Sequence, residues 1–484
     1  MIPLLTKSKY MNGLQCPKYL WMVFHEKDKL PPTDKNTQHR FDEGHLVGEL
    51  AKKLFPSGID IPTDDFSGNL RKSTELLSKK KPLFEAAFSV NQLYSRADVL
   101  KPIGKEWDII EVKSSTDVKD EHIQDVAFQK YVYENAGLKI RKCFLMHINN
   151  KYVRKGEINV KKLFVKKDIT AEVASVKNVE SNISDMFEII NSSSCPSAVL
   201  GKQCKTPYEC PVEECWNMAC GNVFELYNAR GREFELYERG IVSLKDIPSD
   251  FKLNDKQGIQ KECAKTGRVH VNKEGIRSFL SLLKYPLYYL DFETFNSAIP
   301  FYDKSSPYQQ IPFQFSLHVV EKEGLAPVHH SFLASGKGDP RPSFIASLKK
   351  VLGDSGSIIV FNQSFEIPRL KELAVFLPSY KKWVNSTIKR VVDLLVPFRN
   401  FDYYNPLQQG SCSIKDVLPA LTGKSYKDLE INNGGGASLA FLDIAYSKIP
   451  LAEKEKLRRD LEKYCSLDTE GMVWIVGELR GMGK

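Results

Sequence analysis

The sequence lacks long apolar runs, internal repeats and long low-complexity tracts over its 484 residues. A membrane-spanning helix needs about 20 consecutive apolar residues, so we expect none and no membrane partner. The start of the chain, MIPLLTKSKYMNG, has its short apolar stretch before the lysines, which is the wrong order for a secretory signal. We therefore expect a cytoplasmic protein. Zinc-finger and homeodomain spacings are also missing, so sequence-specific duplex binding is not indicated.

The excess of positive over negative charge is small. The chain has 69 Lys and Arg against 60 Asp and Glu, a net charge of +9, which only weakly favours a polyanionic partner. With 42% hydrophobic and 27% charged residues, the composition is that of an ordinary folded protein and excludes collagen, coiled coil and disorder throughout. At roughly 150 residues per domain, the length suggests about three domains.

The hydrophobic periodicity divides the chain into three parts. Residues up to about 81 have helical spacing, and from residue 84 the period falls to two, as in strands. We predict strands over 83–90, 93–100, 107–115 and 142–149, with a helix over 121–137. Later apolar runs predict strands over 285–294, 314–321 and 357–364. The predicted fold class is α/β, with domains over 1–220 and 286–484 joined by a helical segment over 221–285.

One set of residues suggests phosphodiester hydrolysis. Glu111 and Lys113 lie two apart on a predicted strand and therefore share a face, and Asp98 lies on the neighbouring strand of the hairpin. Two facing carboxylates repel, and a divalent cation relieves that repulsion. A lysine beside them can stabilise charge on a phosphorane, as metal-assisted hydrolysis requires.

Further residues around this set produce a resemblance to a known family. Gln129 and Tyr133 share one helical face, and His45 lies upstream in FDEGHLVGEL. With Cys16 and the later cysteines, this order over residues 1–220 resembles the RecB-like PD-(D/E)xK nucleases, and most closely their iron–sulfur branch with CRISPR-associated exonucleases. The resemblance implies a restriction-endonuclease-like fold. It also implies functional residues: His45, Asp98 and Glu111 as ligands of Mg²⁺ or Mn²⁺, Lys113 as the catalytic lysine, and Gln129 and Tyr133 as the Q-x-x-x-Y motif.

Five cysteines crowd the end of the first predicted domain: Cys195, Cys204, Cys210, Cys215 and Cys220. In a chain without a secretory signal, such crowding more often means metal than disulfide. Four thiolates suit either iron–sulfur or zinc, although these spacings differ from the usual zinc pairs. The resemblance implies a 4Fe-4S cluster held by Cys16, Cys204, Cys210 and Cys215. Cys195 and Cys220 remain candidates to replace Cys210 or Cys215.

A second set of acids lies in the last 200 residues. Asp291 and Glu293 end a predicted strand in LDFETF, Glu366 follows the strand of SIIVFNQSFE, and Tyr464 and Asp468 share a helical face in YCSLDTEG. Acids gathered in this way suit two metal ions about 4 Å apart. The order resembles the DEDD exonucleases of the RNase H-like fold, in their tyrosine variant.

This second resemblance implies metal ligation by Asp291, Glu293 and Asp468, with Glu366 and Tyr464 also acting in catalysis. The family normally has Asp where this chain has Glu366, and Asp393 is an alternative acid.

The whole architecture resembles an uncharacterised bacterial family that joins the two domains. Its recurring strings include GSCSIKDVLPAL, over Gly410–Leu421, which we interpret as structural.

The sequence therefore predicts a metal-dependent DNA nuclease, an exonuclease acting on single strands or DNA ends in repair or defence. The expected partner is nucleic acid, DNA in preference to RNA, and no protein partner is indicated. Basic clusters interleaved with aromatics suit phosphates and unpaired bases; they are Lys79–Lys81, Lys151–Lys155, Lys161–Lys167 and Lys381–Arg390. Two alternatives stay open: a 3'-5' exoribonuclease working through the second domain, and a nucleic-acid-binding scaffold with decayed sites.

Overall fold

The computed structural model describes residues 3–484, and the chain divides into two compact units. Unit 1 runs to Asn217 and includes the returning segment Ser297–Gln309, and unit 2 comprises Met218–Asn296 and Gln310–Lys484. Residues 221–285, expected as a linker, therefore group with the second unit. Strand pairing explains this grouping, because residues 270–271 hydrogen-bond to 403–404 in a small sheet. No helix within residues 3–484 is long and apolar enough to cross a membrane.

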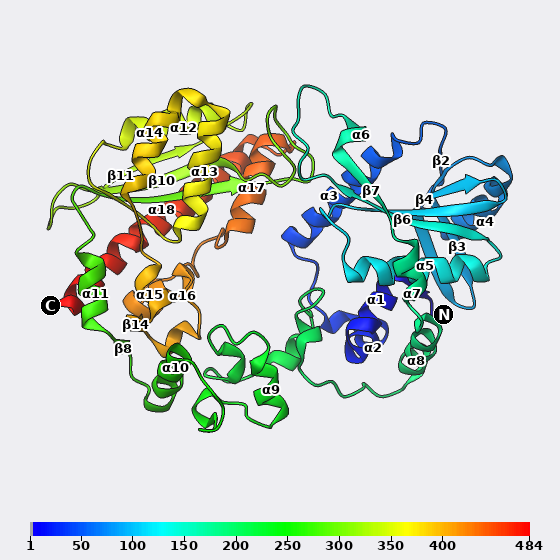
Figure 1. Ribbon diagram of the computed structural model, residues 1–484, viewed down its shortest axis with the longest axis horizontal. Helices are drawn as coiled ribbons and strands as arrows, with labels where there is room; N and C mark the ends of the chain where they lie inside the picture. The colour runs from blue at the N-terminus through cyan, green and yellow to red at the C-terminus, as the bar shows by residue number, and fades with distance from the viewer. Residues whose placement is uncertain (1–2) are drawn as a thin grey trace. The chain divides into compact units, whose positions relative to one another are not determined.

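Unit 1 is a mixed α/β structure (Figure 1). Its strands are β1 (Leu5–Thr6), β2 (Ile59–Asp60), β3 (Leu83–Val90), β4 (Leu93–Ile103), β5 (Glu106–Lys113), β6 (Ile140–Ile148) and β7 (Phe164–Asp168). Its helices are α1 (Lys7–Gln15), α2 (Pro17–His25), α3 (Lys35–Lys52), α4 (Phe66–Leu76), α5 (Asp120–Asn135), α6 (Val160–Leu163), α7 (Thr170–Ser175) and α8 (Val179–Asn191).

The strands of unit 1 form one seven-stranded sheet in the order β2-β3-β4-β5-β6-β7, with β1 paired to β4. Strands β3, β4 and β5 are antiparallel neighbours, whereas β5 and β6 are parallel. Alternation along β5 places Trp107 and Ile109 in the core with Val126 and Phe128 of α5. Since side chains two apart share a face, Glu111 and Lys113 also face α5.

Unit 2 is also mixed α/β (Figure 1). Its strands are β8 (His270–Val271), β9 (Leu287–Phe295), β10 (Ile311–Val320), β11 (Val328–Leu333), β12 (Ser357–Val360), β13 (Val391–Asp393) and β14 (Tyr403–Tyr404). Its helices are α9 (Arg232–Glu238), α10 (Asp255–Thr266), α11 (Lys273–Leu280), α12 (Arg341–Val351), α13 (Gln363–Phe376), α14 (Lys381–Thr387), α15 (Val396–Asn400), α16 (Ile414–Thr422), α17 (Gly434–Tyr446) and α18 (Leu451–Gly483).

The main sheet of unit 2 has the order β11-β10-β9-β12-β13. β9 is antiparallel to β10 and parallel to β12, so it lies in the middle of the sheet and is covered on both faces. Leu290 and Phe292 of β9 pack in the core cluster that includes Phe344 of α12 and Leu370 of α13. The alternate side chains of β9 face the opposite side, where Phe295 contacts Phe441 of α17.

Candidate functional site

The first acid pair lies where β4 and β5 meet. The register of these strands pairs Val99 with Ile110, so the next residues along the two strands are Asp98 and Glu111. Oδ2 of Asp98 accepts a hydrogen bond of 2.7 Å from the backbone N–H of Val112. Burial, with the neighbouring charge of Glu111, raises the pKa of Asp98 to about 7. The two carboxylates therefore influence each other directly, as the strand pattern predicts.

Glu111 is buried, and three side chains bind its carboxylate. Oε1 accepts hydrogen bonds from Nζ of Lys113 and from Nζ of Lys7, each at 2.7 Å, and Oε2 accepts one from Nε2 of Gln129 at 2.7 Å. Burial by itself would raise the pKa of Glu111, but the charges of Lys113 and Lys7 lower it below its ordinary value. Gln129 thus binds the same carboxylate as Lys113 and Lys7.

Asp125 of α5 completes this group. Nζ of Lys113 donates to its Oδ2 at 2.7 Å, and Nζ of Lys7 lies 3.5 Å from its Oδ1. Each lysine therefore spans Glu111 and Asp125. Burial opposes the charged lysines, yet the two carboxylates raise the pKa of Lys113 well above its ordinary value. The result is a compact arrangement of two cations and two anions directly beside Asp98.

Tyr133 and His45 were expected at this site, and neither contacts its acids by a hydrogen bond in the part of the chain described. The hydroxyl of Tyr133 donates to the backbone O of Ala86 at 2.5 Å and accepts from the N–H of Ala97 at 2.7 Å, so it joins α5 to β3 and β4. His45 is exposed on α3. Across residues 3–484, no group of three ligand atoms lying within 4.8 Å of one another contains His45. The structure therefore does not assemble the metal set of His45, Asp98 and Glu111.

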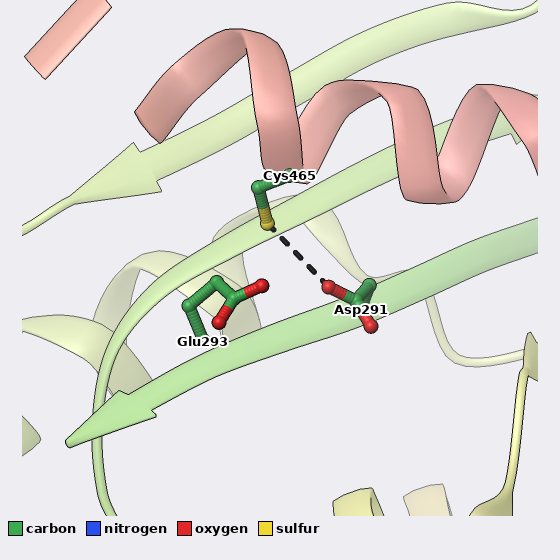
Figure 2. Close-up of side chains that lie close together, drawn as sticks. All are labelled: Asp291, Glu293 and Cys465. Carbon is green, nitrogen blue, oxygen red and sulfur yellow. Dashed lines mark hydrogen bonds between the residues drawn. The ribbon is translucent and has the colours of Figure 1, made fainter. Parts of the chain in front are cut away.

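The second acid set is closer together. Asp291 and Glu293 lie on the face of β9 opposite the Phe292 core, and Cys465 of α18 lies against them (Figure 2). One ligand atom from each of Asp291, Glu293 and Cys465 lies within 4.8 Å of the others. Sγ of Cys465 is 3.6 Å from Oδ2 of Asp291 and donates a hydrogen bond to it. Cys465 is the residue after Tyr464, and the sequence analysis did not select it.

Asp468 faces the same group from α18. Its Oδ1 accepts a hydrogen bond of 2.7 Å from the hydroxyl of Tyr426. Nζ of Lys415 lies 5.2 Å from the ring centre of Tyr464 and 5.7 Å from that of Tyr426. The charge of Lys415 acts on Asp468, Glu293 and Asp291. The segment Gly410–Leu421, interpreted as purely structural, therefore supplies a cation to this site.

The structure distinguishes Glu366 from Asp393. Oδ1 of Asp393 accepts from the backbone N–H groups of Asn362 at 2.9 Å and Leu395 at 3.0 Å. Asn362 has a φ of 86°, so Asp393 stabilises the left-handed turn that begins α13. Glu366, in the first turn of α13, is only 2% exposed, and its Oε2 has no hydrogen-bond partner. Glu366 is thus the acid with unused ligand capacity.

Like charges dominate this second site. Burial raises the pKa of Asp291 and of Glu293 well above their ordinary values, and Asp468 and Glu366 raise both further. Burial also raises the pKa of Asp468 to about 6 and that of Glu366 to about 8. Three buried carboxylic groups and the half-buried Asp291, with one unpartnered oxygen among them, are a donor set that suits a divalent cation. By its residues, the site fits a metal.

Four cysteines of the predicted cluster come together in unit 1. Cys16, which follows α1, Cys204 and Cys210 are buried, and Cys215 is half-buried. Burial raises the pKa of the Cys210 thiol, and Cys16, Cys204 and Cys215 raise it further, so the four groups are electrostatic neighbours. Nε2 of Gln15 donates to the backbone O of Gln203 and of Tyr208, which fastens the end of α1 to the cysteine loop.

The sulfur atoms of these cysteines are not gathered as closely as the four thiolates of a zinc site. Four thiolates around one zinc ion lie about 3.8 Å apart, given Zn–S bonds of about 2.3 Å. No three cysteines of the part described have sulfur atoms within 4.8 Å of one another. Of the remaining candidates, Cys195 is exposed, and Cys220 lies in unit 2, where Nε2 of Gln409 is 3.3 Å from its sulfur.

Comparisons with known proteins give one family match within unit 2 and several similar relatives. Residues 288–413 match a family described as "Domain of unknown function (DUF2779)". The chain is 28% identical over 282 residues to "Uncharacterized protein UU173" of Ureaplasma parvum, covering 52% of this chain and 40% of the relative. It is 30% identical over 244 residues to "Uncharacterized protein MG366 homolog" of Mycoplasma pneumoniae, covering 46% of this chain and 34% of the relative. Each match spans less than half the length of the relative.

The family match contains some of the second site and omits the rest. It includes Asp291, Glu293 and Glu366, and it ends at residue 413, before Lys415 and α18. The residues that sequence reasoning missed are Lys7, Asp125, Lys415, Tyr426 and Cys465. Two of them carried a usable signal from helical spacing: Cys465 lies three residues before Asp468, and Asp125 lies four residues before Gln129, so each shares a face with a predicted site residue.

Proposed function

We propose that the chain is a metal-dependent nuclease that hydrolyses phosphodiesters in nucleic acid. The observation that carries the proposal is the convergence of four acids from one strand and two helices: Asp291, Glu293, Glu366 and Asp468. Asp468 and Glu366 raise the pKa values of both Asp291 and Glu293. Burying like charges is unfavourable unless a cation is bound, so this arrangement costs stability that a structural role would not require. We also propose that unit 1 has a PD-(D/E)xK nuclease fold and unit 2 an RNase H-like fold.

In unit 2, Asp291, Glu293 and Asp468 would hold a divalent cation. When bound, such a cation activates water and stabilises charge on the leaving oxygen. Tyr426 holds Asp468 in place through its hydroxyl. Lys415 supplies a positive charge near the acids, which favours their ionised form and attracts phosphate. Glu366 offers the unpartnered Oε2 as a further ligand.

In unit 1, Asp98 and Glu111 would bind the cation, and Lys113 would stabilise charge on the phosphate. Lys7 and Lys113 both bind Glu111 in the metal-free protein and keep its carboxylate ionised. Gln129 fixes the orientation of that carboxylate by its hydrogen bond to Oε2. Two lysines already neutralise Glu111 and Asp125 in this unit.

A basic hollow in unit 1 supports nucleic acid as the substrate. It has a volume of about 500 Å³, and its lining includes Lys151, Lys155, Lys161 and Lys162. The segment from 149 follows the end of β6, whose register pairs His147 with Lys113 of β5. Since β5 and β6 are parallel, both strands end at the same edge of the sheet. The hollow follows the end of β6, at the sheet edge where β5 also ends, and its lysines would hold phosphates of a strand.

For the cysteines, we propose a structural 4Fe-4S cluster held by Cys16, Cys204, Cys210 and Cys215. It would tie the N-terminal helices to the end of unit 1, which Gln15 and the ion pair of Lys18 with Glu214 at 2.6 Å already join. The expected sign is a brown protein after anaerobic purification. Stoichiometric zinc without iron would refute the assignment.

The test of function is cleavage of labelled single-stranded DNA and RNA, side by side, with Mg²⁺ or Mn²⁺. The full chain is compared with Lys113→Ala, with Asp291→Ala and with the double variant. We expect DNA cleavage in the parent chain and none in the double variant, with each single variant losing the products of its own unit. Cleavage that survives in the double variant would exclude both sites.

Two other outcomes identify the alternatives. Cleavage of RNA alone, lost in Asp291→Ala and kept in Lys113→Ala, would indicate an exoribonuclease working through unit 2. Tight binding of either strand without turnover in any divalent metal would indicate a binding scaffold.

A further inference from the structure

A buried thiol lies among the acids of unit 2. Cys465 is 0% exposed, and its Sγ lies 3.6 Å from Oδ2 of Asp291. Buried cysteines usually act as small apolar side chains. A thiol is also a weak hydrogen-bond donor, so the 3.6 Å contact does little to offset the burial of that carboxylate.

The helix places this thiol where a ligand would lie. Cys465 and Asp468 are three residues apart on α18 and therefore share the face that covers β9. Figure 2 shows Sγ of Cys465 directed towards Asp291 and Glu293 of that strand. The three ligand atoms lie within 4.8 Å of one another, which no other set of three or more acid, histidine or cysteine side chains in residues 3–484 achieves.

An independent observation also indicates that a ligand is bound here. Glu366 is only 2% exposed, and its Oε2 is buried without a hydrogen-bond partner. The charge of Glu366 acts on both Asp291 and Glu293, so its carboxyl group is an electrostatic neighbour of this site. Buried polar atoms are nearly always paired, and a bound cation would satisfy this one.

We propose that Cys465 is a metal ligand, and that its sulfur makes the unit 2 site prefer a first-row transition-metal ion, such as Zn²⁺, to Mg²⁺. This inference rests on the proposed metal site of unit 2 and specifies its ion. Mg²⁺ binds oxygen ligands and rarely sulfur, whereas Zn²⁺ and Co²⁺ accept thiolate together with carboxylate. On coordination, the thiol proton is released to solvent and the sulfur takes its place at the metal.

The experiment uses the full chain stripped of metal and carrying Lys113→Ala, which stops cleavage by unit 1. Metal bound at Asp98 and Glu111 is common to all samples and cancels in the comparison. Co²⁺ serves as the probe, because thiolate bound to Co²⁺ absorbs by charge transfer. Cys465→Ser is compared with the matched control Cys263→Ser, a buried cysteine of unit 2 that packs beside Phe401 and Tyr404, outside the acid group. The other cysteines are common to all samples, so the difference spectra report single sulfur atoms.

We expect Cys465→Ser to lose charge-transfer absorption and to bind Co²⁺ and Zn²⁺ at least tenfold more weakly, with Mg²⁺ binding unchanged. Cys263→Ser should match the parent chain. Circular dichroism checks folding, and Cys465→Ala is the second variant if the serine does not fold. If the absorption and the preference among the ions are the same in Cys465→Ser and the parent, the sulfur is not a ligand.

The same titrations separate this inference from the proposed function. In Asp291→Ala, with Lys113→Ala still present, binding of every divalent ion to unit 2 should fall. If no ion binds differently after loss of Asp291, unit 2 has no metal site, and the proposed function of that unit fails together with the inference. If Asp291 matters and Cys465 does not, the metal site stands and only the inference about sulfur is overturned.

Discussion

The buried acids of unit 2 should make the metal-free protein less stable as the pH rises. Burial, with a contribution from Asp393, raises the pKa of Glu366 from an ordinary value of 4.5 to about 8. Between these values the folded state keeps a proton that the unfolded state has lost, so stability falls as the pH increases. At about 1.4 kcal/mol for each pKa unit, Glu366 alone accounts for a loss of about 5 kcal/mol.

The substitution that tests this reasoning is Glu366→Gln, which keeps the shape and removes the charge. Urea unfolding with a chelator present, at pH 5 and at pH 8, gives the free energy of unfolding. We expect the parent chain to lose stability between these pH values and Glu366→Gln to lose much less. Asp291, Glu293, Asp468 and Asp98 contribute to the residual slope, because their pKa values are also raised by burial.

A second comparison of the two chains is made in the presence of metal. Saturating Zn²⁺ or Mn²⁺ should stabilise the parent chain at pH 8 more than Glu366→Gln, since bound ligand adds to the stability of the folded state alone. If Glu366→Gln is less stable than the parent chain at pH 8 without metal, Glu366 is not under repulsion. That result would refute the electrostatic account of this site.

Three other predictions concern unit 1. Lys113→Ala should abolish cleavage by this unit in a gel assay while the fold and the iron content remain, because Lys7 still neutralises Glu111; undiminished cleavage would contradict the role of Lys113. Tyr133→Phe should lower the free energy of unfolding by about 2 kcal/mol, since the backbone groups of Ala86 and Ala97 lose a partner; a direct catalytic role would instead reduce turnover without loss of stability. Cys16→Ser should lose visible absorbance and iron together, and unchanged iron would exclude Cys16 as a ligand.

The elements that carry the acids could be predicted closely from local patterns. The strand expected over 83–90 is β3 (Leu83–Val90), and β5 and α5 lie within two residues of the expected ranges. Period-two alternation and a helix-ending glycine are patterns of residues close together in the chain. The sequence therefore contains the information that places these strands and this helix. For the same reason, the shared faces of Glu111 with Lys113 and of Asp291 with Glu293 were predictable.

The amino-acid sequence by itself determined which side chains share a face and that two groups of acids would form, because strand and helix periods are local properties. Only the tertiary structure decided which distant groups meet them. Lys7 reaches Glu111 across 104 positions, and Cys465 reaches Asp291 across 174. It also decided that Asp393 stabilises a turn while Glu366 keeps an unpartnered oxygen. Such pairings depend on how helices pack on a sheet, and no short-range pattern in the chain encodes that packing.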